Sequence, residues 1–348
     1  MRAAVQRAFG DPSAVRVEDW PDAVAGPGEV VVRVDAVTLN RTDLHVLERT
    51  NIGRSVELPH IGGLDPAGVV VALGEGVEGV AVGDPIVAKP LIACTTCRFC
   101  AAGDEAMCER PTYVGVHRQG GFAELVALPA RAVFRRPDGL DAVHAATTAH
   151  SVPVVLHLLQ TVGRVGPDDV VVIVGAAGGL GIAALQVAAR VLGARAIGAV
   201  GDPAKGGGLA ALGASAVVSY ADPNGLRERL REAAGDRPPT VIVDNVGDPT
   251  LWPELVASLD KGGRVLSCGA HAGGVVALDL SLFYRMQLRL LSTAGSSAAE
   301  FRRALELVAD GTIEVEPHVV LPLDDIDRAF EELIARRNTG KIVLQVRP

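Results

Sequence analysis

Four of the five cysteines lie within one short segment, CTTCRFCAAGDEAMC, which runs from Cys94 to Cys108. Their spacing is C-x2-C-x2-C-x7-C and places Cys94, Cys97, Cys100 and Cys108 in one loop. Four thiolates complete a tetrahedral zinc and leave no open coordination position, so the loop predicts one structural zinc per chain. An iron–sulfur cluster or four free thiols are the alternatives. Because a disulfide framework does not fit this odd, clustered count, we expect a cytoplasmic protein.

A second chemical signal is the glycine-rich turn GAAGGLG, which follows the β-branched run Val170–Val174 and precedes an apolar helical segment. Glycines between a strand and a helix let the backbone approach a pyrophosphate at the positive end of the helix. The turn therefore predicts a dinucleotide site, with an ordinary tight turn as the alternative. The expected contacts from this turn are Gly175, Ala177, Gly178, Gly179, Leu180 and Gly181.

The end of the second strand distinguishes the two nicotinamide dinucleotides. An acidic residue there would bind the adenosine ribose of NAD and repel a 2′-phosphate. We predict that this strand is Ala196–Gly201, so it ends in Gly201, and Lys205 follows closely enough to pair with a phosphate. Tyr220 is expected to cover the adenine, and Asp202 lies one residue past the position of the acid. We therefore predict NADPH over NADH, with further cofactor contacts at Asn245, Val246, Gly269 and Ala270.

The elements that must position these residues fall into two groups. Up to about residue 130, short alternating runs are cut by Gly and Pro and predict antiparallel strands in a barrel-like domain. From Asp141 the chain reads as helix, with Pro153 near a helix start, and strands and helices then alternate as in a parallel α/β sheet. The uncharged stretch Val170–Ala189 is as long as a membrane span, but its glycines predict a strand, a turn and a helix. Two amphipathic helices and a last strand follow residue 296.

Composition excludes several classes of protein. The chain has 348 residues, 49% of them hydrophobic and 21% charged, which is a globular balance and allows two domains. A net charge of −8 argues against a nucleic-acid partner. The first twenty residues lack the apolar region of a signal peptide, and we expect no membrane partner.

Several segments together resemble the medium-chain dehydrogenase/reductase superfamily, which includes zinc alcohol dehydrogenases and quinone oxidoreductases. The segments are LNRTDLHV, GGLDPAGVVVALGEGV, the cysteine loop, GGFAELVALP, GAAGGLG and GKIVL. The resemblance implies a GroES-like β-barrel catalytic domain at 1–146 and 295–348, and a Rossmann domain with a doubly wound parallel sheet at 147–294. It also implies an active site between the two domains. In similar proteins the strand edge near Leu288–Thr293 pairs across a homodimer, and a tetramer is the alternative.

The resemblance also shows which catalytic ligands are missing. The family's catalytic zinc is held by Cys, His and a third Cys or acid, and the first two positions hold Asn40 and Leu64 here. The third ligand is expected near Thr147–Ser151, where the nearest metal-binding types are His144, His150 and His157. Since Leu64 cannot bind zinc, we predict that the catalytic zinc is absent.

Other positions of the family's site are retained. By resemblance, Thr42 hydrogen-bonds the reacting oxygen, and His45 is the outer histidine of a proton relay. Arg41 lies near the pyrophosphate, and Asp43 forms an internal salt bridge. We expect Asn40 to donate a hydrogen bond to the substrate, and Tyr113 or His45 to protonate its carbon. The alternative for Thr42 and His45 is that they are polar residues of the scaffold.

Without a Lewis acid, reduction of an isolated ketone loses several kcal/mol of transition-state stabilisation. A conjugated C=C spreads the charge into an enolate, which a few hydrogen bonds can hold. We therefore predict NADPH-dependent reduction of an enone, an enoyl thioester or a quinone. The alternatives are an alcohol or carbonyl reductase that works without catalytic zinc or recruits a metal through His150, and a dinucleotide-binding sensor or structural protein. With 3% aromatic residues, an aliphatic or polar substrate is favoured.

Overall fold

The computed structural model describes residues 1–347, which form two compact units. Unit 1 comprises Met1–His150, Ser297–Ala309 and 315–347, and unit 2 comprises Ser151–Ser296 and Asp310–Glu314. The chain thus leaves unit 1 near residue 150 and returns to it twice.

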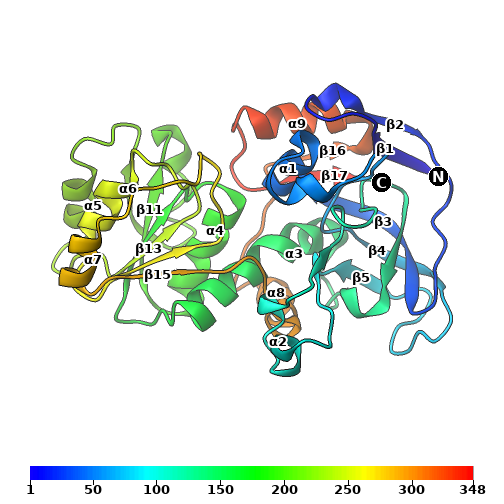
Figure 1. Ribbon diagram of the computed structural model, residues 1–348, viewed down its shortest axis with the longest axis horizontal. Helices are drawn as coiled ribbons and strands as arrows, with labels where there is room; N and C mark the ends of the chain where they lie inside the picture. Colours follow the sequence, from blue (N-terminus) through cyan, green and yellow to red (C-terminus); the bar gives the residue numbers. More distant parts are fainter. Residues whose placement is uncertain (348) are drawn as a thin grey trace. The chain divides into compact units, whose positions relative to one another are not determined.

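Unit 1 is built on a largely antiparallel seven-stranded sheet (Figure 1). Its strands, in spatial order, are β16 (Val319–Pro322), β17 (Ile342–Gln345), β3 (Glu29–Leu39), β4 (Ala67–Leu73), β5 (Pro85–Ala88) and β9 (Val133–Arg135), and β8 (Leu125–Pro129) also pairs with β3. β3 pairs with three other strands because it is 11 residues long, and most of its residues are buried. The predicted barrel-like domain of antiparallel strands is confirmed.

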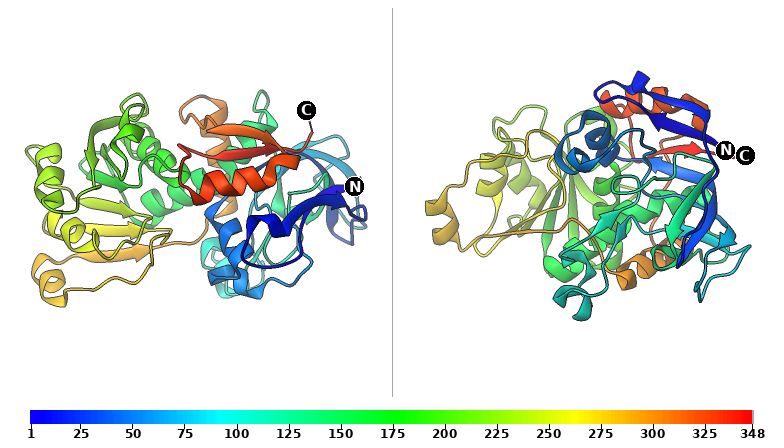
Figure 2. Two further views of the ribbon diagram at one scale, coloured as in Figure 1. Left: turned by 90° about the horizontal axis from the view of Figure 1, so that it is seen from above. Right: turned by 45° about the vertical axis from the view of Figure 1, so that its right-hand side comes forward.

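Unit 1 also contains two small sheets and several helices. The two small sheets are β1 (Arg2–Gln6) with β2 (Val15–Asp19), and β6 (Leu91–Ile92) with β7 (Thr112–Tyr113). The helices wholly within unit 1 are α1 (Arg41–Glu48), α2 (Arg98–Ala101), α8 (Ala298–Ala309) and α9 (Ile326–Ile334). Helix α9 packs its apolar face on β16 and β17 (Figure 2), so both predicted C-terminal helices and the last strand are confirmed.

Unit 2 contains a parallel six-stranded sheet in the order β12-β11-β10-β13-β14-β15. The strands are β10 (Val170–Val174), β11 (Arg195–Val200), β12 (Ala214–Ser219), β13 (Val241–Asp244), β14 (Arg264–Ser267) and β15 (Arg289–Ser292). The helices are α4 (Gly179–Gln186), α5 (Leu226–Ala234), α6 (Trp252–Ser258) and α7 (Leu280–Met286). Since β10 and α4 both lie within Val170–Ala189, the prediction of a strand, a turn and a helix is confirmed. The strand order reverses between β10 and β13, which is the position where doubly wound sheets bind ligands.

Helix α3 (Ala142–Leu156) connects the two units and continues as a wider turn over His157–Val162. Pro153 lies inside this helix, so the expectation that it marks a helix start is wrong. Its ring removes one backbone hydrogen bond, but buried apolar neighbours on both sides keep the segment helical. Ala142–Val162 is long and apolar enough to cross a membrane, but 78% of its most apolar window is buried, as in a core helix.

Candidate functional site

The glycine turn follows the carboxyl end of β10 and leads directly into α4. Gly175 adopts a left-handed conformation with φ of 72°, and Gly178 is the N-cap of the helix. At Gly181 a Cβ atom would lie 2.2 Å from the carbonyl oxygen of Gly175, so only glycine fits there. Ala177 is buried, whereas Gly179 and Leu180 are half-buried. The turn therefore leaves partly exposed backbone beside the N-terminus of α4, where a pyrophosphate can approach it.

The ends of β13 and β14 meet this turn. A Cβ atom on Gly175 would lie 3.2 Å from the side chain of Val246, and one on Gly269 would lie 3.3 Å from the carbonyl oxygen of Asn245. A Cβ atom on Gly247, the residue after Val246, would lie 3.2 Å from Ala270. The structure therefore brings together the residues that we predicted from three separate segments.

Asn245 gives the fit test for a dinucleotide in unit 2. Its Oδ1 accepts the backbone N–H of Cys268 at 3.2 Å and lies 3.1 Å from the thiol of Cys268. Its Nδ2 is buried and has no partner among the residues described. A buried amide without a partner costs free energy, which a ligand with an acceptor group would relieve. This orphaned donor, the glycine cradle and the helix N-terminus fit a bound dinucleotide.

The second strand, β11, ends at Val200, one residue earlier than predicted, and Gly201 follows it. A Cβ atom at Gly201 would lie 3.0 Å from the ring of Tyr220, so these two predicted residues are neighbours. Lys205 lies on the short helical turn Pro203–Gly206. The Asp202 carboxylate accepts the backbone N–H of Ala204 at 3.0 Å and thereby caps this turn.

In unit 1, α1 carries Arg41, Thr42 and His45 in its first two turns. Thr42 and His45 are three positions apart and therefore lie on one side of the helix. The Nδ1 of His45 lies 3.0 Å from the Thr50 hydroxyl, and burial lowers the pKa of His45, so its imidazole is neutral near pH 7. Burial, and then the charge of Arg336, lower the pKa of Arg41, which indicates a partly desolvated cationic pair.

Asn40 lies in a buried polar cluster and is 4% exposed. Its Nδ2 donates to Asp65 at 3.0 Å and approaches the hydroxyl and carbonyl oxygens of Thr38 at 3.2 and 3.3 Å. Its Oδ1 accepts a short hydrogen bond from the Lys341 ammonium. Every polar atom of the Asn40 side chain is thus engaged inside unit 1, which does not fit the predicted hydrogen bond from Asn40 to a substrate.

Asp43 differs from its expectation as well. Instead of forming an ion pair, its carboxylate accepts the backbone N–H of Asn40 at 2.7 Å and that of Gly63 at 3.2 Å. Burial, with a smaller contribution from the charge of Asp65, raises the pKa of Asp43 to about 7. The ion pair of this region is formed by Lys341 and Asp65, 3.9 Å apart. Among residues 1–347 no cation pairs with Asp43, so the expected internal salt bridge is wrong, and two backbone N–H groups hold the buried carboxyl group instead.

The positions matched to catalytic zinc ligands hold side chains that do not fit a metal. Leu64 is 1% exposed, and Asn40 is held as described above. Near the expected third ligand, Thr147 and Thr148 donate to carbonyl oxygens of their own helix. His144 contacts Asp141 at 2.7 Å. Among residues 1–347, the group of His, Cys or acidic side chains close enough to share a metal is the cysteine loop.

The four cysteine Sγ atoms converge within 4.8 Å of one another. Cys97 and Cys100 are 3.4 Å apart and Cys94 and Cys100 are 3.9 Å apart, near the S–S edge of about 3.8 Å that Zn–S bonds of about 2.3 Å require. The backbone N–H of Thr96 lowers the pKa of Cys94 to about 5, whereas burial raises that of Cys100 to about 12. The four sulfur atoms thus converge as a tetrahedral site requires, which supports the predicted structural zinc site.

Tyr113 lies between the cysteine lobe and α1. It packs against Cys97 and Cys108 on one side, and against Val46 and its apolar neighbours on the other. Burial raises its pKa, so the phenol keeps its proton at neutral pH. It neighbours α1 through Val46, the residue after His45.

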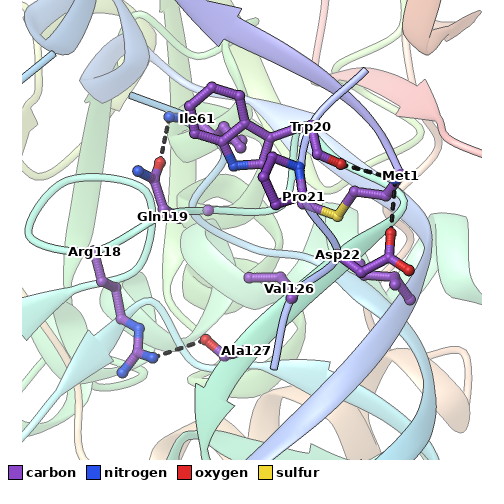
Figure 3. A pocket seen from close by; sticks show the side chains of 12 residues that line it. Met1, Trp20, Pro21, Asp22, Ile61, Arg118, Gln119, Val126 and Ala127 are labelled. Atoms are coloured by element: carbon purple, nitrogen blue, oxygen red, sulfur yellow. Dashed lines mark hydrogen bonds and ion pairs between the residues drawn. The ribbon is translucent and has the colours of Figure 1, made fainter. Parts of the chain in front are cut away.

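A pocket of about 370 Å³ in unit 1 is separate from all of these residues. Trp20 and Gln119 are among the residues that line it (Figure 3). The Gln119 amide oxygen accepts the N–H of Ile61 at 2.5 Å. Arg118 donates to the carbonyl oxygen of Ala127 at 2.8 Å. None of the predicted catalytic or cofactor residues lines this pocket, so we do not assign it to catalysis.

Sequence reasoning missed Lys341, Thr38 and Asp65. The motif GKIVL was noted, but only as a family segment. The burial of Lys341 could have been predicted from its position directly before an apolar strand. A buried lysine needs an anionic or polar partner.

Comparison with known proteins agrees with this architecture. Residues 26–138 match the alcohol dehydrogenase GroES-like domain, and residues 179–310 match the zinc-binding dehydrogenase family. The chain is 30% identical to an NAD-dependent alcohol dehydrogenase of Sulfolobus acidocaldarius, over 99% of this chain and all of that protein. It is 26% identical to an acryloyl-coenzyme A reductase of Sulfurisphaera tokodaii, over 97% and 98% of the two chains. A crystal structure of an NAD-dependent alcohol dehydrogenase superposes over both whole chains with a TM-score of 0.93 and 34% identity.

Proposed function

Since this chain belongs to the medium-chain zinc alcohol dehydrogenase superfamily of NAD(P)-dependent oxidoreductases, we propose that it reduces an activated C=C bond with NADPH. The substrate class is an enone, an enoyl thioester or a quinone. The observation that carries this proposal is the pair of matched ligand positions, in which Leu64 is buried and the amide of Asn40 is fully hydrogen-bonded.

NADPH, when bound, would supply a hydride to the β-carbon of the substrate. The negative charge that would then develop on the carbonyl oxygen needs hydrogen-bond donors from the protein. The hydroxyl of Thr42 is the donor that we assign to this oxygen. His45 lies on the same side of α1 as Thr42, and its Nδ1 lies within hydrogen-bond distance of the Thr50 hydroxyl. His45 and the protonated phenol of Tyr113 are the two candidates for delivering a proton to the α-carbon. Arg41, partly desolvated beside Arg336, is assigned to the pyrophosphate.

The second candidate is an alcohol or carbonyl dehydrogenase. The names of the relatives favour it over the first, because the alcohol dehydrogenases are the more similar and threonine dehydrogenases also match. The acryloyl-coenzyme A reductases, at 26 and 27% identity, favour the first. In this second function the carbonyl oxygen would draw its hydrogen bond from Thr42 without a Lewis acid, or from a metal recruited through His150.

NADPH is proposed because Gly201 carries no acid and Lys205 follows on an adjacent turn. The Asp202 carboxylate is already engaged by Ala204, which lowers its availability to a ribose. Two similar dehydrogenases are named for NAD, and they favour NADH instead. A cytoplasmic location is proposed because zinc-binding thiols persist in a reducing compartment.

One assay separates the candidates. The purified protein is mixed with NADPH or NADH and with a panel of enones, enoyl thioesters, quinones, aldehydes and alcohols, while its metal content is measured. Turnover of the conjugated acceptors with one zinc per chain supports the first function. Turnover restricted to alcohols and aldehydes supports the second, and two metals per chain would refute metal-free catalysis. Thr42→Val should lower kcat at least tenfold, whereas Thr250→Val, at an exposed threonine, should not.

We also propose a homodimer through the edge of the unit 2 sheet. Strand β15 is the terminal strand of that sheet, and Leu290 on it is 49% exposed. Leu280 and Tyr284 on the adjoining α7 are 68% and 73% exposed. An unpaired edge beside exposed apolar side chains is a surface that a second copy would cover.

A further inference from the structure

The motif GKIVL leads into β17, the last strand of unit 1, which pairs antiparallel with β3. Ile342 pairs with Leu39 and Val343 with Thr38. In this register Lys341 and Asn40 are the next facing positions, although 301 residues separate them. The lysine therefore lies beside the start of α1, because β17 begins where β3 ends.

Lys341 is buried at this place. It is 7% exposed, and Thr38, Asn40 and Asp65 around it are at most 4% exposed. Its ammonium donates to the Asn40 amide oxygen and to the Thr38 hydroxyl at 3.3 Å, and it lies 3.9 Å from Asp65. A buried cation persists only when such partners satisfy it, so the four side chains form one interdependent unit.

Asn40 passes this restraint on to α1. Lys341 fixes its amide oxygen, Asp65 and Thr38 fix its amide nitrogen, and Asp43 in the first turn accepts its backbone N–H at 2.7 Å. Asn40 is the residue that precedes the helix, so its orientation sets the direction in which the helix leaves β3.

We propose that Lys341 is a positioning residue for the reaction, which clamps Asn40 and thereby holds Thr42 and His45 of α1 in place. Asn40 then acts through the helix and not by contact with substrate. This inference rests on the proposed function for its catalytic consequence, but the clamp itself can be measured separately.

The clamp is tested by a double-mutant cycle with Lys341→Met, Asn40→Ala and the double variant. Lys341→Met should lower kcat about tenfold to a hundredfold, because small displacements of reacting groups cost that much, and leave KM for NADPH within twofold. The double variant should be no slower than Asn40→Ala alone, since both changes break one clamp. Lys341→Gln, which keeps a donor for the Asn40 oxygen, should regain part of the rate.

A folded Lys341→Met protein with wild-type kcat, or fully additive effects in the cycle, would overturn the proposal. If Lys341→Met does not fold, the same comparison is made between Lys341→Gln and Asn40→Ala. Lys261→Met, at an exposed lysine, is the matched control.

An activity-independent measurement keeps this test apart from the proposed function. The imidazole resonance of His45, assigned with His45→Gln, should shift in Lys341→Met and Asn40→Ala and stay in place in the control. If the wild type reduces no acceptor while these resonances shift, the proposed function fails and the clamp stands. Unshifted resonances in both folded variants refute the clamp.

Discussion

Replacing Gly181 by alanine tests the cofactor site most directly. The added Cβ atom would lie 2.2 Å from the Gly175 carbonyl oxygen and 2.7 Å from the Cα of Ala176. Ordinary contact begins near 3.4 Å, so the turn must open by about 1.2 Å, the difference between 3.4 and 2.2. Both neighbours are backbone atoms and cannot rotate away. Overpacking of this kind typically costs about 1–3 kcal/mol of stability.

The same displacement moves the backbone that we assign to the pyrophosphate. We therefore expect the Kd for NADPH to rise at least ~10-fold, which corresponds to ~1.4 kcal/mol. The Kd is measured by titrating the fluorescence of the bound nucleotide, and stability by urea unfolding.

Gly166→Ala is the matched control for this experiment. Gly166 lies before β10 in the same unit, and an added Cβ there meets nothing within 4 Å. This variant should bind NADPH as the wild type does. A folded Gly181→Ala protein whose Kd stays within twofold of wild type would falsify the assignment of this turn to the cofactor.

Four further predictions follow from named contacts. Lys205→Ala should weaken NADPH at least tenfold and leave NADH within twofold in parallel titrations; equal weakening of both contradicts its pairing with the 2′-phosphate. Cys108→Ser should reduce zinc from one per chain to none and lower the Tm, as read by metal analysis and calorimetry; retained zinc argues against the four-cysteine site. Folding raises the pKa of Asp43 from 3.8 to about 7, so between these pH values the folded protein binds more protons than the unfolded chain. The contribution of Asp43 to stability therefore falls as the pH rises through this range. Urea unfolding at pH 4.5 and 7.5 should therefore show the stability advantage of wild type over Asp43→Asn shrinking at the higher pH; an advantage that grows is the contrary result. Leu290→Arg should convert a dimer into monomers in light scattering, and a wild-type monomer would already exclude that interface.

Much of the site could be predicted because its chemistry is local in the sequence. The cysteine ligands fall within one loop, so their spacing predicted a shared metal site, and the convergence of the four sulfur atoms in the structure agrees with it. The glycine turn follows five β-branched residues and precedes a helix, so strand, turn and helix were readable from residue types. The C-terminal helix α9 was predicted as amphipathic from its period, and one face of it is buried.

Local rules failed where long-range packing decided the outcome. Pro153 disfavours a helix interior, but burial of the apolar residues around it outweighs one lost hydrogen bond. Asp43 was expected to find a cation, and the fold instead gave its carboxylate two backbone donors. Neither result depends on sequence neighbours alone.

By itself, the sequence predicted the metal-binding loop, the dinucleotide turn and the alternation of strands and helices, because each depends on residues that are close together in the chain. Only the tertiary structure decided what Asn40 does. Its partner Lys341 lies 301 residues away in the sequence. The two residues meet because the start of β17 pairs with the end of β3. Because the Lys341 ammonium is buried, it needs hydrogen-bond acceptors from the protein, and the amide oxygen of Asn40 is one of them. Hydrogen-bond partners of a buried side chain are set by pairing across the fold, which spacing along the chain does not contain.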